Sequence, residues 1–190
     1  MDSVSHVIVV RDLSVSPWPE KRCVLTIGAY DGVHRGHQAV IAAVREQAKS
    51  LNALSVVVTF DKHPASVVRP ESAPLLLTDL EQKIELLSTT GVDAVVVVLF
   101  NKEQSTEEPQ AFVKRVLVDC LHVQHIVVGE DFHFGKNRSG NVALLRTEGA
   151  KYDFTTGPLD LLAREDGVEE PISSTAIRRA LRGGEIDTAT

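Results

Sequence analysis

Cysteine, positive charge and long apolar runs are all scarce in this chain of 190 residues. Its two cysteines, Cys23 and Cys120, are too few for a disulfide-stabilised fold and have no metal-binding spacing. The formal net charge of −6 argues against a nucleic-acid binder, which usually carries a basic surface. The longest apolar run, 94–100, is far below the ~20 residues that span a bilayer, and the apolar patch 7–10 is too short for a signal peptide. We therefore expect a cytoplasmic protein with no nucleic-acid and no membrane partner.

The residues that are present are typical of a globular domain. Hydrophobic residues make up 43% of the chain and charged residues 24%, close to the average for folded proteins. A chain of this length can bury enough apolar surface for one substantial core. We therefore expect a single domain over residues 1–190.

Short apolar runs alternate with segments of helical period along most of the chain. Strands are predicted at 24–29, 55–60, 94–100 and 125–129, with a short edge strand at 7–10. Helices are predicted at 34–51, from a capping box of Thr78 and Glu81 to Gly91, and at about 107–121. This order predicts a parallel sheet with helices on both faces, and right-handed crossovers make it a Rossmann-like doubly wound α/β fold.

The other segments are less regular. An irregular excursion is predicted at 61–77, which contains three prolines, and a Gly-rich and aromatic loop at 130–141. A short helix is predicted at 141–148, one or two strands within 151–164, and an acidic turn at 166–171. A final helix is expected to be capped by Ser174, to bury Ile177, Ala180 and Leu181, and to end at Gly183-Gly184.

The stretch 24–37 combines a buried strand, a Gly-rich turn and a helix start that carries His34 and His37. Such a β-loop-α unit gathers free backbone N–H groups, a helix dipole and two imidazoles around one point, which suits a polyphosphate. Gly28, Gly32 and Gly36 would allow a tight turn and close approach of the ligand. The alternatives are two solvated histidines, or half of a zinc site, which would need a third protein ligand. No other histidine has a convincing spacing for that ligand.

Three further segments point to ligand binding. In 172–178, the hydroxyls of Ser174 and Thr175 and the guanidinium of Arg178 would converge near a helix N-terminus, although a plain Ser-capped amphipathic helix has the same features. The loops 59–70 and 128–140 follow predicted parallel strands, and ligands bind at the carboxyl ends of such strands. Within the second loop, Phe134 could equally be a core plug and Asp131 an ordinary turn residue.

These four segments resemble the motifs of one family, the HxGH nucleotidyltransferases. They are most similar to the FMN adenylyltransferase module of bacterial bifunctional FAD synthetases, whose patterns are GxFDGVHxGH, TFDPHP…RP, VGxDFxFGxxRxG and ISSTxIR. The resemblance extends from Val24 to Gly184. Tyr30 replaces the usual Phe and adds a hydroxyl near the nucleotide, while Pro171 stands where many relatives carry a basic residue. That second departure removes one expected phosphate contact.

The resemblance implies transfer of AMP from ATP to the phosphate of FMN, giving FAD and pyrophosphate, with Mg²⁺ bound to ATP. It also implies that the irregular C-terminal segment contributes to the flavin and nucleotide site. The catalytic residues would be His34, His37 and Arg178. ATP binding would involve Gly28, Ala29, Tyr30, Gly36, Ser174 and Thr175, and flavin binding Asp61, His63, Pro64, Asp131 and Phe134. No metal-binding residue is predicted.

Two other interpretations stay open. A different HxGH transferase would share the first motif, and a nucleotide- or flavin-binding module without turnover would share the fold. We also expect no riboflavin kinase domain in this chain, because the sequence stops at Thr190 and has no Pro-Thr-Ala-Asn motif. A kinase module in cis or in trans would then be a partner, and the sequence fits both a single-activity protein and a part of a bifunctional enzyme.

Overall fold

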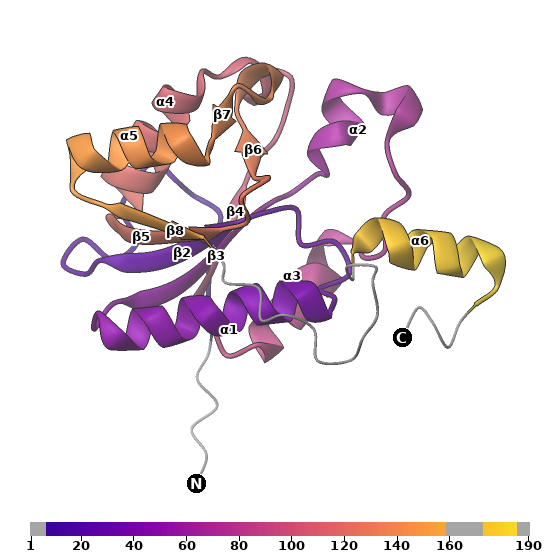
Figure 1. Ribbon diagram of the computed structural model, residues 1–190, viewed down its shortest axis with the longest axis horizontal. Helices are drawn as coiled ribbons and strands as arrows, with labels where there is room; N and C mark the ends of the chain where they lie inside the picture. Colours follow the sequence, from indigo (N-terminus) through magenta and orange to yellow (C-terminus); the bar gives the residue numbers. More distant parts are fainter. Residues whose placement is uncertain (1–6, 159–172, 186–190) are drawn as a thin grey trace, which may run out of the picture.

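Six parallel strands form the main sheet of the computed structural model, which describes residues 7–158 and 173–185 (Figure 1). They are β1 (Ile8–Val10), β2 (Cys23–Ile27), β3 (Leu54–Phe60), β4 (Ala94–Val98), β5 (Val123–Val128) and β8 (Thr155–Pro158). Their spatial order is β1-β4-β3-β2-β5-β8, and each neighbouring pair is parallel. The predicted doubly wound α/β fold is confirmed. The chain builds outward from β2 in both directions, so a topological switch point lies at the end of this strand.

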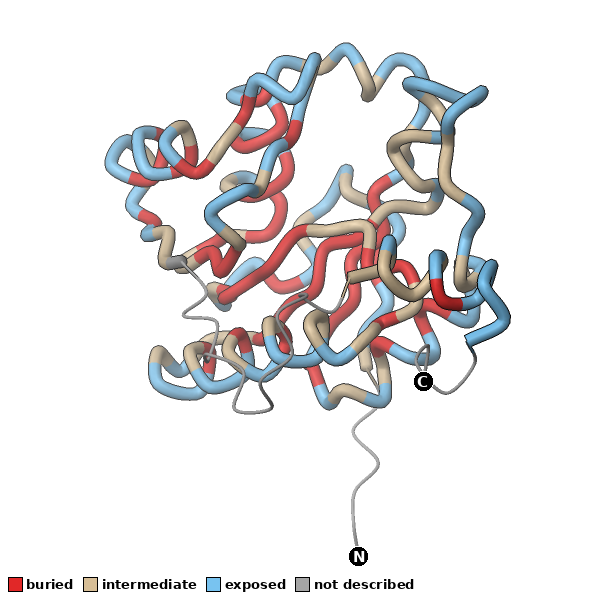
Figure 2. The backbone as a smooth tube through the Cα atoms, turned by 45° about the vertical axis from the view of Figure 1, so that its right-hand side comes forward, coloured by how far each residue is buried: buried red, intermediate tan, exposed pale blue. Residues whose placement is uncertain are grey.

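Helices cover both faces of the sheet (Figure 1). On one face, α1 (Arg35–Ser50) and α3 (Leu80–Thr89) pack through buried residues such as Ile41 and Leu87. On the other lie α4 (Pro109–Phe112), its π-helical continuation η3 (Val113–Cys120) and α5 (Val142–Tyr152). Every residue of β2 and β4 is buried, which explains why all of them except Thr26 are apolar. Figure 2 shows the strands as a buried band between helices with exposed outer surfaces.

Two segments predicted to be irregular contain short regular elements. Residues 61–77 include α2 (Pro64–Val68) and the 3₁₀ turn η1 (Pro70–Ser72). Pro64 begins α2 because the first helical position needs no N–H donor, while His63 before it stays extended with ψ 126°. Residues 130–141 hold a two-stranded hairpin of β6 (His133–Phe134) and β7 (Gly140–Asn141) around η4 (Lys136–Arg138). The predictions of irregular structure there were wrong.

Both predicted helix caps are shifted by one residue. The capping box of α3 consists of Asp79 and Gln82 rather than Thr78 and Glu81. The N-cap of α6 (Ser174–Gly183) is Ser173, whose side chain accepts a hydrogen bond from the backbone N–H of Ala176. Adjacent short polar residues, Thr78-Asp79 before α3 and Ser173-Ser174-Thr175 at the start of α6, make the register ambiguous in the sequence.

The last two helices, α5 and α6, agree only in part with the prediction. Helix α6 ends at Gly184, which has a φ of 75°, as predicted. Of the residues expected to face inward, Ala180 is buried, Ile177 is half-buried and Leu181 is 44% exposed. Helix α5 is longer than predicted. The acidic turn at 166–171, with Pro171 and Ile172, lies outside the described residues. No helix within the described ranges is long and apolar enough to cross a membrane.

Candidate functional site

The loop that follows β2 lies at the topological switch point of the sheet. The N–H of Gly28 donates to the carbonyl of Val58 at 3.0 Å, which fixes the start of the loop against β3. A Cβ at Gly28 would lie 2.9 Å from the ring of Tyr30, and one at Gly32, where φ is 79°, would lie 2.8 Å from Leu77. These two glycines are therefore required by the turn. Gly36 instead lies in the first turn of α1.

His34 and His37 are held face to face at the start of α1. His34 is the N-cap, and its Nδ1 accepts a hydrogen bond from the backbone N–H of His37 at 3.3 Å. The two rings stack with centroids 3.6 Å apart and an interplanar angle of 19°. Because Nδ1 of His34 is an acceptor, the neutral imidazole ring of His34 carries its proton on Nε2. Nδ1 of His37 is buried without a hydrogen-bond partner among the described residues.

Both histidines are neutral at pH 7. Burial lowers the pKa of His34, and the nearby positive charge of Arg178 lowers it further. Burial, with a smaller contribution from His34, lowers the pKa of His37 to about 3. The carboxylate of Asp31 opposes these shifts without overcoming them. Each ring is therefore available as a neutral hydrogen-bond donor.

Asp31 joins three segments at this point, although it was not among the predicted site residues. Its carboxylate accepts hydrogen bonds from the N–H of Leu77 at 2.9 Å and from the N–H and hydroxyl of Thr78 at 3.0 and 3.2 Å. The guanidinium of Arg178 forms an ion pair with the other oxygen. Burial raises the pKa of Asp31, but these hydrogen bonds and Arg178 outweigh it and leave the pKa below its usual value. Its position between Gly28 and Gly32 was the feature of the sequence that could have identified Asp31 as a site residue.

Helix α6 is docked onto the first loop. The hydroxyl of Ser174 donates to the carbonyl of Asp31 at 3.0 Å, and Nε of Arg178 donates to the carbonyl of Leu75 at 2.6 Å. Thr175 is exposed in the first turn of the same helix. The structure thus brings the two predicted phosphate motifs together. Arg178 itself binds protein groups through Nε and Nη2, and the guanidinium has further N–H donors for an anion.

The side chain of Tyr30 is buried within the protein. It is only 3% exposed, and its hydroxyl lies 2.7 Å from Oγ1 of Thr26 in a buried hydrogen bond. Burial raises its pKa strongly. The added hydroxyl therefore stabilises the loop instead of lying near the nucleotide. The ring does pack against the ring of His37, with centroids 4.8 Å apart.

The loop after β3 begins with Asp61 and continues into α2. Oδ1 of Asp61 accepts a hydrogen bond from the N–H of Phe100 at 2.6 Å, which ties this loop to the end of β4. His63 is the N-cap of α2, and its Nδ1 accepts from the N–H of Ala65 at 3.2 Å. Burial and then the charge of Arg178 lower the pKa of His63, so the predicted flavin loop lies within electrostatic reach of the phosphate motifs.

The second predicted flavin loop carries one buried and one exposed site residue. Phe134 is 8% exposed and packs against Phe112 and Phe132, with ring centroids 5.9 and 5.5 Å away, so the core-plug interpretation fits its position. Asp131 is exposed. The predictions did not include η2 (Gln104–Thr106), which contacts both α2 and η4 and so links the two loops. The N–H of Lys136 donates to the carbonyl of Glu107 beside it.

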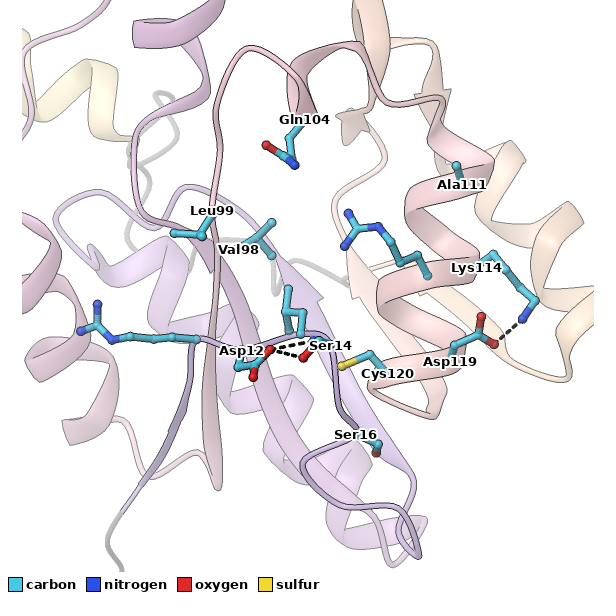
Figure 3. A pocket seen from close by; sticks show the side chains of 13 residues that line it. Asp12, Ser14, Ser16, Val98, Leu99, Gln104, Ala111, Lys114, Asp119 and Cys120 are labelled. Atoms are coloured by element: carbon cyan, nitrogen blue, oxygen red, sulfur yellow. Dashed lines mark hydrogen bonds and ion pairs between the residues drawn. The ribbon is translucent and has the colours of Figure 1, made fainter.

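A cavity of about 820 Å³ lies elsewhere, between the segment after β1, the end of β4 and η3 (Figure 3). Its wall includes Ser14, Leu99, Gln104 and Cys120, and the close-up shows Asp12 bound to Ser14. None of the predicted site residues lines it. The predicted residues of the first loop, the loop after β3 and α6 lie instead at the carboxyl ends of β2 and β3, whereas Asp131 and Phe134 lie beyond the end of β5.

Similar sequences are found over nearly the whole chain. A profile of the FAD synthetase family matches residues 16–176. The bifunctional riboflavin kinase/FMN adenylyltransferase of Pseudomonas fluorescens is 42% identical over 172 residues, which are 90% of this chain and 54% of that protein. The protein of the same name from Escherichia coli is 38% identical over 168 residues, 88% of this chain and 53% of its own length. The chain therefore spans about half the length of these relatives.

Two solved structures share the fold. A protein described as a macrolide-efflux protein from Streptococcus pneumoniae superposes with a TM-score of 0.77 at 23% identity, over 96% of this chain and 60% of its own. Pantothenate synthetase from Thermus thermophilus gives a TM-score of 0.51 at 15% identity, over 96% and 79%. At these identities the likeness concerns the fold alone. The family profile, by contrast, covers the whole of the first predicted phosphate motif and residues 172–176 of the second, and this chain belongs to the FAD synthetase family.

Proposed function

We propose that this chain is an FMN adenylyltransferase, which transfers AMP from ATP to the phosphate of FMN and releases pyrophosphate. The observation that carries the proposal is the docking of α6 onto the first loop through Asp31, Ser174 and Arg178. It places the hydroxyls and guanidinium of one phosphate motif beside the stacked histidines of the other. Family membership supports the same substrates.

The proposed transfer of AMP requires correctly positioned substrates rather than a general base. The nucleophile is already a phosphate anion, so no side chain has to remove a proton or form a covalent intermediate. His34 and His37 would donate hydrogen bonds where negative charge grows at the α-phosphate and the bridging oxygen. Arg178, Ser174 and Thr175 would bind the β- and γ-phosphates. The backbone of Gly28, Ala29, Tyr30 and Gly36 would bind the nucleotide.

Mg²⁺ would bind with ATP. Asp31, the carboxylate whose charge acts on both histidines, already accepts protein hydrogen bonds and an ion pair. The ATP phosphates and water are therefore the expected ligands, as is usual for Mg²⁺. The ion would neutralise phosphate charge and favour pyrophosphate as the leaving group.

The flavin would occupy the end of the molecule where α2 and the β6–β7 hairpin are linked by η2. Asp61, His63, Pro64 and Asp131 lie on these loops, and Phe134 would support them from the core. The names of the relatives include riboflavin kinase, and we propose that this second activity belongs to a module outside residues 1–190. A single adenylyltransferase domain and a cytoplasmic location stay predictions.

Turnover with two flavins tests this proposal. The chain, incubated with ATP and Mg²⁺, should convert FMN to FAD and should form no FMN from riboflavin. The variant with both His34→Ala and His37→Ala, purified in parallel, controls for contaminating host enzymes. Folded protein that binds ATP but makes no FAD would overturn the proposed activity, and FMN formed from riboflavin would overturn the assignment of the kinase step.

A further inference from the structure

Lys83 is a buried cation beneath the carboxyl ends of two central strands. It lies in α3, is 7% exposed, and is the only lysine in the described ranges that is buried. No ion pair given by the described residues includes it. A buried ammonium is costly unless polar groups surround it, so its position calls for an explanation.

The ammonium holds two backbone carbonyls that begin the two predicted ligand loops. Nζ donates to the carbonyl of Phe60, the last residue of β3, at 2.7 Å and to the carbonyl of Ala29, just after β2, at 3.2 Å. The hydroxyl of Thr59 also donates to the carbonyl of Ala29, at 3.1 Å. Asp31 and Asp61 lie one or two residues beyond these carbonyls. Lys83 thus links the starts of the two loops, together with the hydrogen bond from Thr59.

Charged groups face Lys83 from each loop that it holds. Burial lowers the pKa of its ammonium, and the carboxylates of Asp31 and Asp61 act in the opposite direction. The positive charge of Lys83 also contributes to the lowered pKa of His63, and Arg178 forms an ion pair with Asp31. Anionic substrates bound at these loops would meet an ammonium that carries one more N–H than its two carbonyl partners use.

We propose that Lys83 is a positioning residue that couples the ATP half and the FMN half of the site, by holding both strand ends in register with one positive charge. The proposal rests on the proposed function. Removing the ammonium should therefore weaken the binding of both substrates rather than of one. It should also abolish any effect of one substrate on the affinity for the other, because the shared contact would be gone.

The test compares Lys83→Met with Lys49→Met, an exposed lysine in the last turn of α1. Equilibrium binding of a non-hydrolysable ATP analogue and of FMN would be measured separately and together. We expect Lys83→Met to lose about tenfold or more in affinity for each ligand, the scale of hydrogen bonds to a charged group, and Lys49→Met to lose none. Unchanged affinities, or a loss confined to one ligand in a folded variant, would overturn the proposal.

A second measurement decides the matter if Lys83→Met does not fold. As the pH is raised, the wild-type chain should lose affinity for both ligands together, and at a lower pH than an ordinary lysine would deprotonate, because burial lowers the pKa of the ammonium. Lys83→Arg keeps its charge as the pH is raised and should hold its affinities constant. Parallel losses in both proteins would overturn the role of Lys83. Absence of FAD formation by the unaltered chain would instead overturn the proposed function itself, and this inference with it.

Discussion

At the scale of single residues, the site is a set of short polar contacts around Asp31 and the two histidines. In the proposed reaction, these neutral imidazoles would act through directed N–H groups rather than through charge. His34→Ala or His37→Ala should therefore lower kcat by ~10²–10³-fold, the usual effect of losing one donor to a developing oxyanion, while ATP binding weakens much less. Arg178→Ala should raise KM for ATP more than it lowers kcat. Arg178 would bind phosphates whose bonding does not change, so it would bind the ground state and the transition state equally. Steady-state kinetics with equilibrium ATP binding would measure the difference.

The pKa of His37 makes stability depend on pH. Its value is about 3 in the folded chain and near 6.5 when exposed, so the unfolded state binds more protons between these values. The free energy of unfolding should therefore fall as pH is lowered through this range. His37→Gln should reduce the loss between pH 7 and pH 4.5 by about 2–3 kcal/mol, as measured by urea unfolding. The remaining slope in the range of histidine titration would come from His34, His63 and His125, whose pKa values are lowered too. An unchanged slope would contradict the buried, neutral His37.

Asp31 should matter for both stability and ATP binding. Asp31→Asn keeps the shape of the side chain but removes the charge that balances Arg178, whose side chain is 11% exposed. Breaking a buried ion pair should cost about 3 kcal/mol of unfolding free energy. KM for ATP should also rise, since α6 would lose its main anchor on the first loop. Glu81→Gln, at an exposed ion pair with Arg11, is the matched control and should change neither quantity. A normal KM in a destabilised Asp31→Asn variant would contradict the role of α6 in binding.

At the scale of elements, substitutions at two helix caps should distinguish an effect on stability alone from an effect on both stability and ATP binding. Asp79→Ala removes the capping box of α3 and should lower the free energy of unfolding by about 1 kcal/mol, with KM values unchanged. Ser173→Ala removes the cap of α6, whose N-terminal turn faces the first loop, and should raise KM for ATP as well. Thermal unfolding and kinetics on the two variants would show this contrast. Equal effects on KM would contradict it.

The helices and strands also show which structural features could be predicted from the sequence alone. Buried parallel strands and long helices were predictable because apolar periodicity specifies them. The caps of α3 and α6 were misplaced by one residue because Thr78, Asp79, Ser173 and Ser174 are all good caps, and the choice depends on tertiary contacts. Thr78 and Ser174 are instead used to bind Asp31. Short elements such as α2 have too few residues for a periodic signal.

The site was predictable only where it is local in sequence. His34 and His37 were found from one motif, and the second motif supplied Arg178. The partners of Asp31 and Lys83 could not be found, because each is a contact between distant segments that only the folded chain defines. The assignment of Asp61, His63, Pro64, Asp131 and Phe134 to the flavin stays a prediction.

At the scale of the whole molecule, the fold brings two phosphate motifs to one switch point, and the central claim is direct transfer of AMP to FMN by positioning alone. Exchange of labelled pyrophosphate into ATP, measured with and without flavin, tests this claim most directly. The chain should form FAD and pyrophosphate in equal amounts and should catalyse exchange only when flavin is present, since no adenylyl-enzyme forms. Exchange without flavin, or binding of both substrates without FAD, would contradict the account.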